Sequence, residues 1–420
     1  MRKLIGIVAG VCLSSQAFAA VDEKAVLHHY ADIAHAMYED SLITAKQLQT
    51  AVNKLIAKPT EKNLAAARTA WKSARVPYQQ TEVYRFGNAI VDDWEGKVNA
   101  WPLDEGLIDY VSASYGDESD ENPYYTVNVV ANKSLMLSGR KIDASKITKK
   151  LLAETLHEVD GVEANVATGY HAIEFLLWGQ DLNGTGPGAG SRPATDFDTK
   201  NCSQGHCDRR AGYLKAATDL LVDDLTWMMK QWTQNGQARQ ELMKDGSKKG
   251  LAIIFTGMGS LSYGELAGER MKLGLMLHDP EEEHDCFSDN THWSHYYDVK
   301  GIQNIYTGRY TRINGKTLSG PSVSDLVAGK DKQIDVTLKK NLDATMAKMQ
   351  VLVDSAEKKN QAYDQLIANN NEKGNAKVLA AINALLDQTK TIEKAVATLG
   401  LAKIAFEGSD SLDAPNEVYQ

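Results

Sequence analysis

Apolar side chains recur along most of this chain at the three- and four-residue steps of amphipathic helices. The first such pattern covers residues 22–57, and Lys58-Pro59 ends it. Thr60 stands where a second helix needs its N-cap, and Pro77 is expected to kink or interrupt that helix. Further helical patterns cover residues 166–178, 208–235, 251–277, 332–369 and 374–398. The sequence therefore predicts an all-α fold.

Strand-like alternation is rare, and TVNVVA (126–131) is the best candidate for a small β-hairpin. A segment rich in Gly, Pro and Ser (184–198) separates two helical blocks and is the best linker candidate. We therefore expect two packed helical-bundle domains joined by long loops, with at most one small hairpin. The predicted N-terminal domain covers residues 20–195, and the predicted C-terminal domain covers 196–420.

The first residues have the form of an export signal. A short basic start and the apolar run LIGIVAGVCL precede a small-x-small cleavage sequence that ends at Ala19. The apolar run is too short for a permanent membrane span. Val11 before Cys12 is a poor fit to a lipoprotein cleavage box. We predict a signal peptide over residues 1–19, cleavage after Ala19, and a soluble periplasmic protein.

The balance of acidic and basic residues limits the kinds of molecule that this protein is expected to bind. Without the signal peptide, which holds Arg2 and Lys3, 44 basic residues stand against 55 acidic ones, a net charge of −11. This excess of acid argues against nucleic acid and against an anionic membrane surface as partners. It suits a protein that handles cations, although most proteins of this acidity handle no metal.

Three cysteines remain after cleavage, and two of them lie five residues apart in the polar stretch NCSQGHCD. In an oxidising compartment, a local disulfide between Cys202 and Cys207 is the favoured interpretation. The alternative is a metal site that uses both thiolates with His206, but the spacing matches neither a zinc knuckle nor a haem attachment motif. Cys286 is then left unpaired.

The stretch GYHAIEFLLWGQD (169–181) places two ionisable side chains in an apolar helix. His171 and Glu174 are three residues apart, so they share one helix face. Because burying both groups is costly unless each finds a partner, they are either a mutually hydrogen-bonded structural pair or half of a site. HDPEEEHDCFSDNTHWSH (278–295) repeats the spacing with Glu281 and His284, at the start of a helix that Asp279 is expected to cap.

Two such pairs offer four ligands, a set that suits iron or zinc and whose carboxylates favour iron. Glu82 and Asp104 are further candidate ligands on charge and spacing. The alternatives are an interface hydrogen-bond network for Glu82 and a solvated loop for Asp104. The sequence contains no His-Glu-x-x-His zinc motif and no Gly-x-Ser-x-Gly nucleophile elbow.

The Gly-x-His-x-x-Glu motif of Gly169, His171 and Glu174 resembles that of the imelysin family, most closely its members of the iron-regulated protein A type. The similarity extends through TAWKSARVPYQQTEVYRFG, WPLDEGLIDY, CSQGHCDRRAGYLKAATDLL, SYGELAGERM and EEEHDCFSDNTHWSHYYDVKGIQNIYTG. The resemblance implies two helical bundles with the motif at the cleft between them, in the periplasm or at the outer membrane. It also implies a role in iron acquisition, with His171 and Glu174 at the core of the site.

On this basis we expect a protein that binds iron or an iron-containing ligand, with zinc as the alternative metal. A membrane component of iron uptake is the expected protein partner. A metallopeptidase of the insulin-cleaving type is the first alternative, although HAIEF lacks the second histidine that such enzymes use. The second alternative is an interaction protein that binds a peptide or a siderophore without coordinating a metal directly.

Overall fold

The computed structural model describes residues 21–117 and 119–418. The predicted signal peptide, with its cleavage after Ala19, lies outside these residues. Within them, no helix combines the length and the apolar character that a membrane span requires.

The first two helices form where the apolar pattern predicts them. Helix α1 (Glu23–Ala57) is capped by Asp22, and α2 (Glu61–Gln79) is capped by Thr60, whose side chain accepts a hydrogen bond from the Asn63 backbone N–H. Pro77 lies in the last turn of α2 and does not end the helix. As a result, α2 continues past the buried Arg75 to Gln79.

Helices also form in the five further predicted ranges, and others, among them α3 and α12, form outside those ranges. In the N-terminal half these are α3 (Ala89–Asn99), α4 (Glu105–Ile108), α5 (Lys149–Leu151), α6 (Gly169–Trp178), α7 (Cys207–Gln231) and α8 (Gln237–Met243). In the C-terminal half they are α9 (Ser247–Ser260), α10 (Gly274–Leu277), α11 (Thr291–Thr307), α12 (Val323–Lys330), α13 (Lys332–Lys359), α14 (Tyr363–Ile367), α15 (Glu372–Thr398) and α16 (Asp410–Asp413). Cys202 and Cys207 form the predicted disulfide at the start of α7, and Cys286 is a free thiol.

Two predicted helices differ in detail from the structure. The pattern over 251–277 is one continuous helical rod, but its middle, Leu261–Leu273, has the wider π-helical turn between α9 and α10. The pattern over 332–369 divides into α13 and α14 because Asn360 adopts a left-handed conformation (φ 51°) that ends α13.

The small hairpin exists, but the predicted location at 126–131 is wrong. Strands β1 (Ser134–Leu137) and β2 (Arg140–Asp143) pair a few residues later, and a second hairpin joins β3 (Arg309–Thr311) to β4 (Thr317–Ser319). Asn128 has a φ of 47°, which turns the chain. Val129 and Val130 are buried, and their N–H groups donate to the carbonyls of Leu107 and Ile108. Their apolar character reflects this burial and not a strand.

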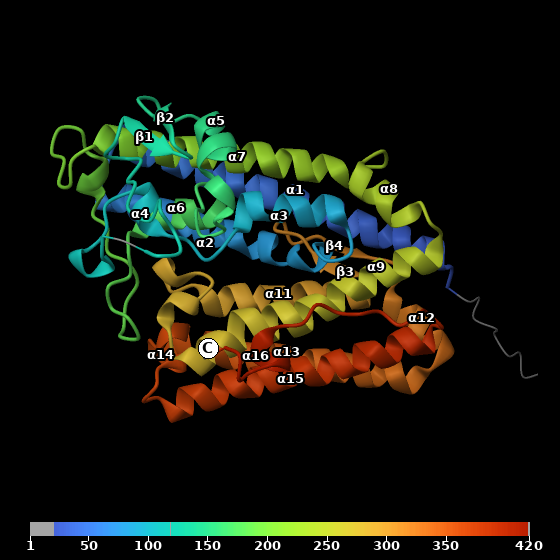
Figure 1. Ribbon diagram of the computed structural model, residues 1–420. Helices are drawn as coiled ribbons and strands as arrows, with labels where there is room; N and C mark the ends of the chain where they lie inside the picture. The colour runs from blue at the N-terminus through green and yellow to red at the C-terminus, as the bar shows by residue number, and fades with distance from the viewer. Residues whose placement is uncertain (1–20, 118, 419–420) are drawn as a thin grey trace, which may run out of the picture.

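The helices pack as two groups. In the first group α1 contacts α2 and α7, and α6 contacts α2, α3 and α7; in the second, α13 lies between α11 and α15. Figure 1 shows the first group, blue to green, above the second, yellow to red. Helices α2 and α11 pack against each other across the boundary. Helix α7 packs with the first group, although it lies beyond residue 196, where the predicted C-terminal domain begins. The division into two domains stays a prediction.

The start of α6 requires a glycine. Gly169 has a φ of +78°, which L side chains rarely adopt. A Cβ at this position would lie 2.4 Å from the carbonyl oxygen of Val98, a backbone atom of α3 that has no rotamer to yield. The close approach of α3 to α6 therefore depends on the absence of a side chain at residue 169.

We predict that Gly169→Ala lowers the free energy of unfolding by about 3 kcal/mol, because it combines backbone strain with a clash. Gly212 is the matched control: it lies inside α7, and a Cβ there would meet no atom within 4 Å. Gly212→Ala should be neutral or stabilise by up to about 1 kcal/mol. Chemical denaturation of both variants measures the difference, and equal effects would contradict the close approach at Gly169.

Candidate metal centre

The His–Glu pair of the motif lies on a helix with no exposed face. All ten residues of α6 are buried, which is expected of a helix that is apolar around most of its circumference. The Nδ1 of His171 and the Oε2 of Glu174 are 3.0 Å apart. The predicted shared face is therefore occupied by a hydrogen bond between the two side chains.

The carboxylate of Glu174 is engaged at both oxygens. Its second oxygen, Oε1, accepts a hydrogen bond of 3.0 Å from the backbone N–H of Ser288. Burial raises the pKa of Glu174 well above its usual value, and the negative charge of Asp285 raises it further. Because both oxygens are occupied, Glu174 fixes the orientation of the His171 ring and ties α6 to a segment 114 residues away.

Two residues of that segment complete a cluster with His171. Ligand-type atoms of His171, His284 and Asp285 all lie within 4.8 Å of one another, and all three residues are buried. The imidazole rings of His171 and His284 have centroids 4.8 Å apart. Two imidazoles and a carboxylate from two distant segments are a donor set that proteins use for iron and zinc.

The imidazoles of the cluster are in the form that binds a metal. Burial, followed by the positive charge of Arg75, lowers the pKa of His171 to about 3. Burial and the charge of Arg270 lower the pKa of His284 well below its usual value. Both rings are therefore neutral near pH 7, and the Nε2 of His171 is buried without a hydrogen-bond partner. A neutral imidazole whose other nitrogen is already engaged presents this nitrogen to a ligand.

Asp285 supplies a charged oxygen. Burial alone would raise its pKa, but the charge of Arg75 outweighs burial and brings the pKa to about 2. The Arg75 guanidinium donates to Oδ1 at 2.8 Å, while Asn290 and Ser294 donate to Oδ2 at 2.8 and 2.5 Å. The cluster thus combines two neutral imidazoles with one carboxylate that stays ionised.

Sequence reasoning did not select Asp285, although it directly follows His284 in the chain. The expected helix beginning at Pro280 is only the 3₁₀ turn Pro280–Glu282, capped by Asp279, and Glu283 is already extended. Without a helix, the three-residue spacing of Glu281 and His284 does not place them on one face. The adjacency of His284 and Asp285 was the useful signal, because an irregular segment can present neighbouring side chains to the same point.

The remaining predicted ligands lie elsewhere in the described structure. Glu82 accepts a hydrogen bond of 2.8 Å from Arg270, Asp104 accepts one of 2.5 Å from Asn122, and Glu281 is exposed. The structure therefore brings His171, Glu174 and His284 together and leaves Glu82, Asp104 and Glu281 outside the cluster. Metal binding by any of the six stays a prediction.

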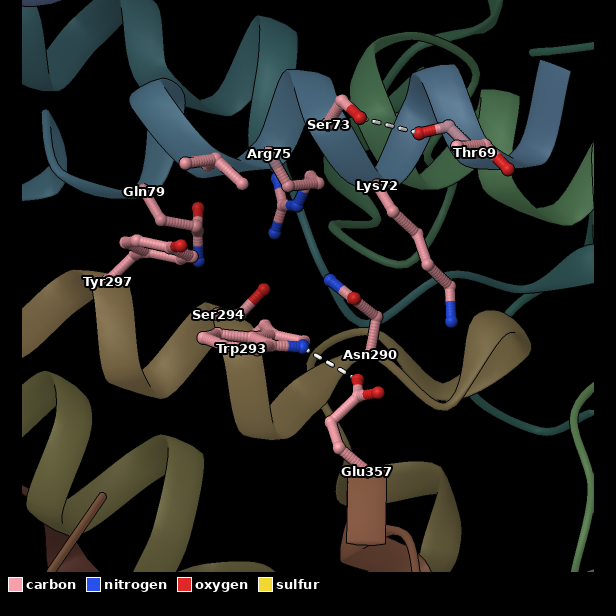
Figure 2. A pocket seen from close by; sticks show the side chains of 11 residues that line it. Thr69, Lys72, Ser73, Arg75, Gln79, Asn290, Trp293, Ser294, Tyr297 and Glu357 are labelled. Carbon is pink, nitrogen blue, oxygen red and sulfur yellow. Dashed lines mark hydrogen bonds between the residues drawn. The ribbon is translucent and has the colours of Figure 1, made fainter. Parts of the chain in front are cut away.

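A pocket of about 300 Å³ lies next to Asp285, between α2 and α11 and beside Glu357 of α13. Arg75, Asn290 and Ser294, the side chains that hold Asp285, also line this pocket. Figure 2 shows them together with Lys72, Gln79, Trp293 and Tyr297 around the same space. The rings of Trp293 and Tyr297 stack with centroids 5.5 Å apart, and both polar side-chain atoms of Gln79 are buried without a partner. Polar groups beside an aromatic surface suit a small organic ligand.

A further buried histidine lies outside the cluster. His295 is fully buried against the ring of Tyr363, and neither of its nitrogens has a hydrogen-bond partner. Burial and the charge of Arg270 lower its pKa to about 3. Because the unfolded chain protonates this histidine near its ordinary pKa of about 6.5, His295 destabilises the fold as the pH falls from about 6.5 towards 3.

We predict that His295→Leu removes this destabilisation. The free energy of unfolding of the variant, measured relative to wild type, should rise by about 1.4 kcal/mol for each pH unit between pH 6 and pH 4. Above pH 7.5 the difference should stay constant, since histidine is then neutral in both states. Urea titrations at each pH measure it, and a difference independent of pH from 6 to 4 would contradict the burial of a neutral imidazole.

The fold of this chain is similar to that of a protein of known structure. A crystal structure assigned as an iron-regulated protein A precursor from Parabacteroides distasonis has a TM-score of 0.64 and 17% sequence identity, covering 92% of this chain and 97% of that chain. At this identity the likeness shows the fold. Iron-regulated protein A from Synechococcus elongatus is 42% identical over 64 residues, which are 15% of this chain and 18% of that relative. This match therefore spans less than a fifth of the relative's length.

The profile of the imelysin family matches residues 34–392. This range contains α6 with its Gly-x-His-x-x-Glu motif and both residues of the later segment that completes the cluster. The match covers well over half of the chain, and the predicted resemblance is confirmed. This chain belongs to the imelysin family.

Proposed function

We propose that this protein binds iron, or a small iron-containing ligand, at the cluster of His171, His284 and Asp285. One observation carries the proposal: metal-ligand side chains from two distant segments meet within 4.8 Å in the buried interior. An imidazole nitrogen buried without a partner costs about 1–3 kcal/mol. A bound cation would offset this cost and would also use the charge of Asp285.

The surroundings of the cluster support a metal ligand role for His171. A metal-bound histidine usually gives its other nitrogen to a carboxylate, and Glu174 occupies that position against Nδ1. Two histidines and one carboxylate are a common set for non-haem iron. Zinc accepts the same donors, so it is the alternative metal. The name of the similar proteins, iron-regulated protein A, favours iron.

The pocket between α2 and α11 supports the second possibility in the proposal, a small organic ligand that contains iron. If iron arrives with an organic chelator, Trp293 and Tyr297 offer it a stacking surface, and Lys72 and Gln79 offer charge and hydrogen bonds. Both oxygens of Glu174 are already engaged, which supports binding over peptide hydrolysis, since hydrolysis needs a free base next to a bound water.

We place this function in the periplasm, in iron uptake, with a membrane uptake component as the partner that receives the cargo. The basic and apolar first residues and the cleavage sequence ending at Ala19 support export. The similar structure from Parabacteroides distasonis is described as a precursor, which agrees with a processed chain. The net negative charge suits a protein that attracts cations.

Isothermal titration of the mature chain tests the proposal directly. We expect one ferrous or ferric ion per chain, and we expect His171→Ala/His284→Ala and Asp285→Asn each to lose measurable binding. Zinc titrated in parallel separates the two candidate metals. His295→Leu is the matched control, because it alters a buried histidine outside the cluster and should retain the ion. Equal affinity in the wild type and the double variant would exclude the site.

Glu174→Gln tests the orienting role of the carboxylate. The variant keeps the size of the side chain and an oxygen that can accept from Ser288, but its amide holds the His171 ring less strongly. We expect a 10- to 100-fold loss of metal affinity with the far-UV circular dichroism unchanged. An unchanged affinity would leave Glu174 with a purely structural role.

A further inference from the structure

A second group of acidic side chains lies near the candidate metal centre but outside it. A small cavity is lined by Asp181, which follows α6, by Glu281 and Glu283 around the 3₁₀ turn, by Asp364 of α14, and by Cys286. Figure 1 places α14 and the loop after α6 at the same end of the molecule. Four carboxyl groups from three separate segments therefore surround one space.

The space has the size of a single ion or water. Its volume is about 10 Å³, close to the minimum that one water molecule needs. Glu283 and Asp364 are only 1% and 2% exposed, whereas Glu281 is exposed at the surface. The cavity thus has a buried acidic floor and an acidic residue near its opening.

Three buried carboxyl oxygens around the cavity have no hydrogen-bond partner: both oxygens of Asp364 and one of Glu283. Glu283 accepts a hydrogen bond of 3.1 Å from Thr291 at Oε2, but its Oε1 is buried without any. The charges that act on Glu283 come from other acids, first Asp364, then Asp289 and Asp181. Burial, with repulsion from Asp289 and Asp181, raises the pKa of Asp364 to about 7. A buried carboxylate oxygen among like charges is costly unless something positive meets it.

The geometry points to a second cation site at this cavity, one that takes a hard divalent ion of the calcium type. Carboxylate oxygens are the ligands that calcium prefers, and calcium tolerates irregular geometry with six to eight oxygens, whereas magnesium requires a near-ideal octahedron. Among the described residues only the His171 cluster brings three ligand atoms within 4.8 Å of one another, so an ion at this cavity would have to draw its carboxyl groups inward. A bound ion would join the loop after α6 to α14.

This site shares no ligand with the cluster of His171, His284 and Asp285, although Glu283 directly precedes His284 in the chain. Its predicted effect is on stability: an ion that binds only the folded chain raises the unfolding temperature. The four carboxyl groups repel one another without the ion. Substitutions that remove two of the charges should therefore preserve or raise the stability of the ion-free protein while abolishing its response to calcium.

The test is thermal unfolding of the mature chain after treatment with a chelator, with CaCl₂, MgCl₂ or NaCl added at matched ionic strength. We expect CaCl₂ at millimolar concentration to raise the unfolding temperature by roughly 3 °C or more, and equilibrium dialysis with radioactive calcium to find one ion per chain. Glu283→Gln/Asp364→Asn should lose both the rise and the ion, with an ion-free unfolding temperature no lower than that of wild type. Asp387→Asn, which removes an exposed carboxylate elsewhere, should keep both.

The His171→Ala/His284→Ala variant should also keep the calcium response. This variant therefore shows whether the calcium site exists even if the iron site does not. Three results would overturn the second site: no rise with CaCl₂ beyond that with NaCl, an equal rise in Glu283→Gln/Asp364→Asn, or a wild-type stability that responds to pH but not to calcium. The last result would mean that protons alone neutralise the carboxyl groups.

Discussion

The buried ion pair between Arg75 and Asp285 is the interaction on which the centre of this molecule depends. Arg75 is on α2 and Asp285 precedes α11, so the pair joins the two groups of helices where they meet. The same guanidinium donates to Asn99 at 2.6 Å and lies 3.3 Å from the Nδ1 of His284. Removing either charge would leave the other buried alone, at a cost of about 3–5 kcal/mol. The pair thus fixes the position of the cluster and also holds Asp285 in its ionised form.

A second buried arginine repeats this arrangement in the other group of helices. Arg270, on the π-helical stretch Leu261–Leu273, forms ion pairs with Glu82, Glu265 and Asp298. Its charge helps to keep His284 and His295 neutral. Glu82 therefore belongs to an interface hydrogen-bond network, one of the two alternatives that its sequence left open. Burial, with the charges of the two arginines added to it, keeps His171, His284 and His295 uncharged in the interior near neutral pH.

The sequence predicts those features that depend on local spacing. Apolar periodicity locates α1, α2, α6, α7 and α15, and the three-residue spacing of His171 and Glu174 predicts their shared face. The spacing does not predict the contact between α6 and the segment that holds His284 and Asp285, which lies more than a hundred residues later in the chain. That contact depends on Gly169, on the irregular backbone after Pro280, and on Arg75, which no periodic rule connects. For the same reason Asp285 was not predicted, and Glu281 was assigned to a helix that is three residues long.

The distance along the chain between the two halves of the cluster has a kinetic consequence. His171 is made early and Asp285 late, and their contact requires α2 and α11 to be packed together. A partly synthesised or partly folded chain contains α6, but in it His284 and Asp285 have not yet reached His171, so the cluster is incomplete. The cluster of His171, His284 and Asp285 is therefore complete only after the two groups of helices have packed together.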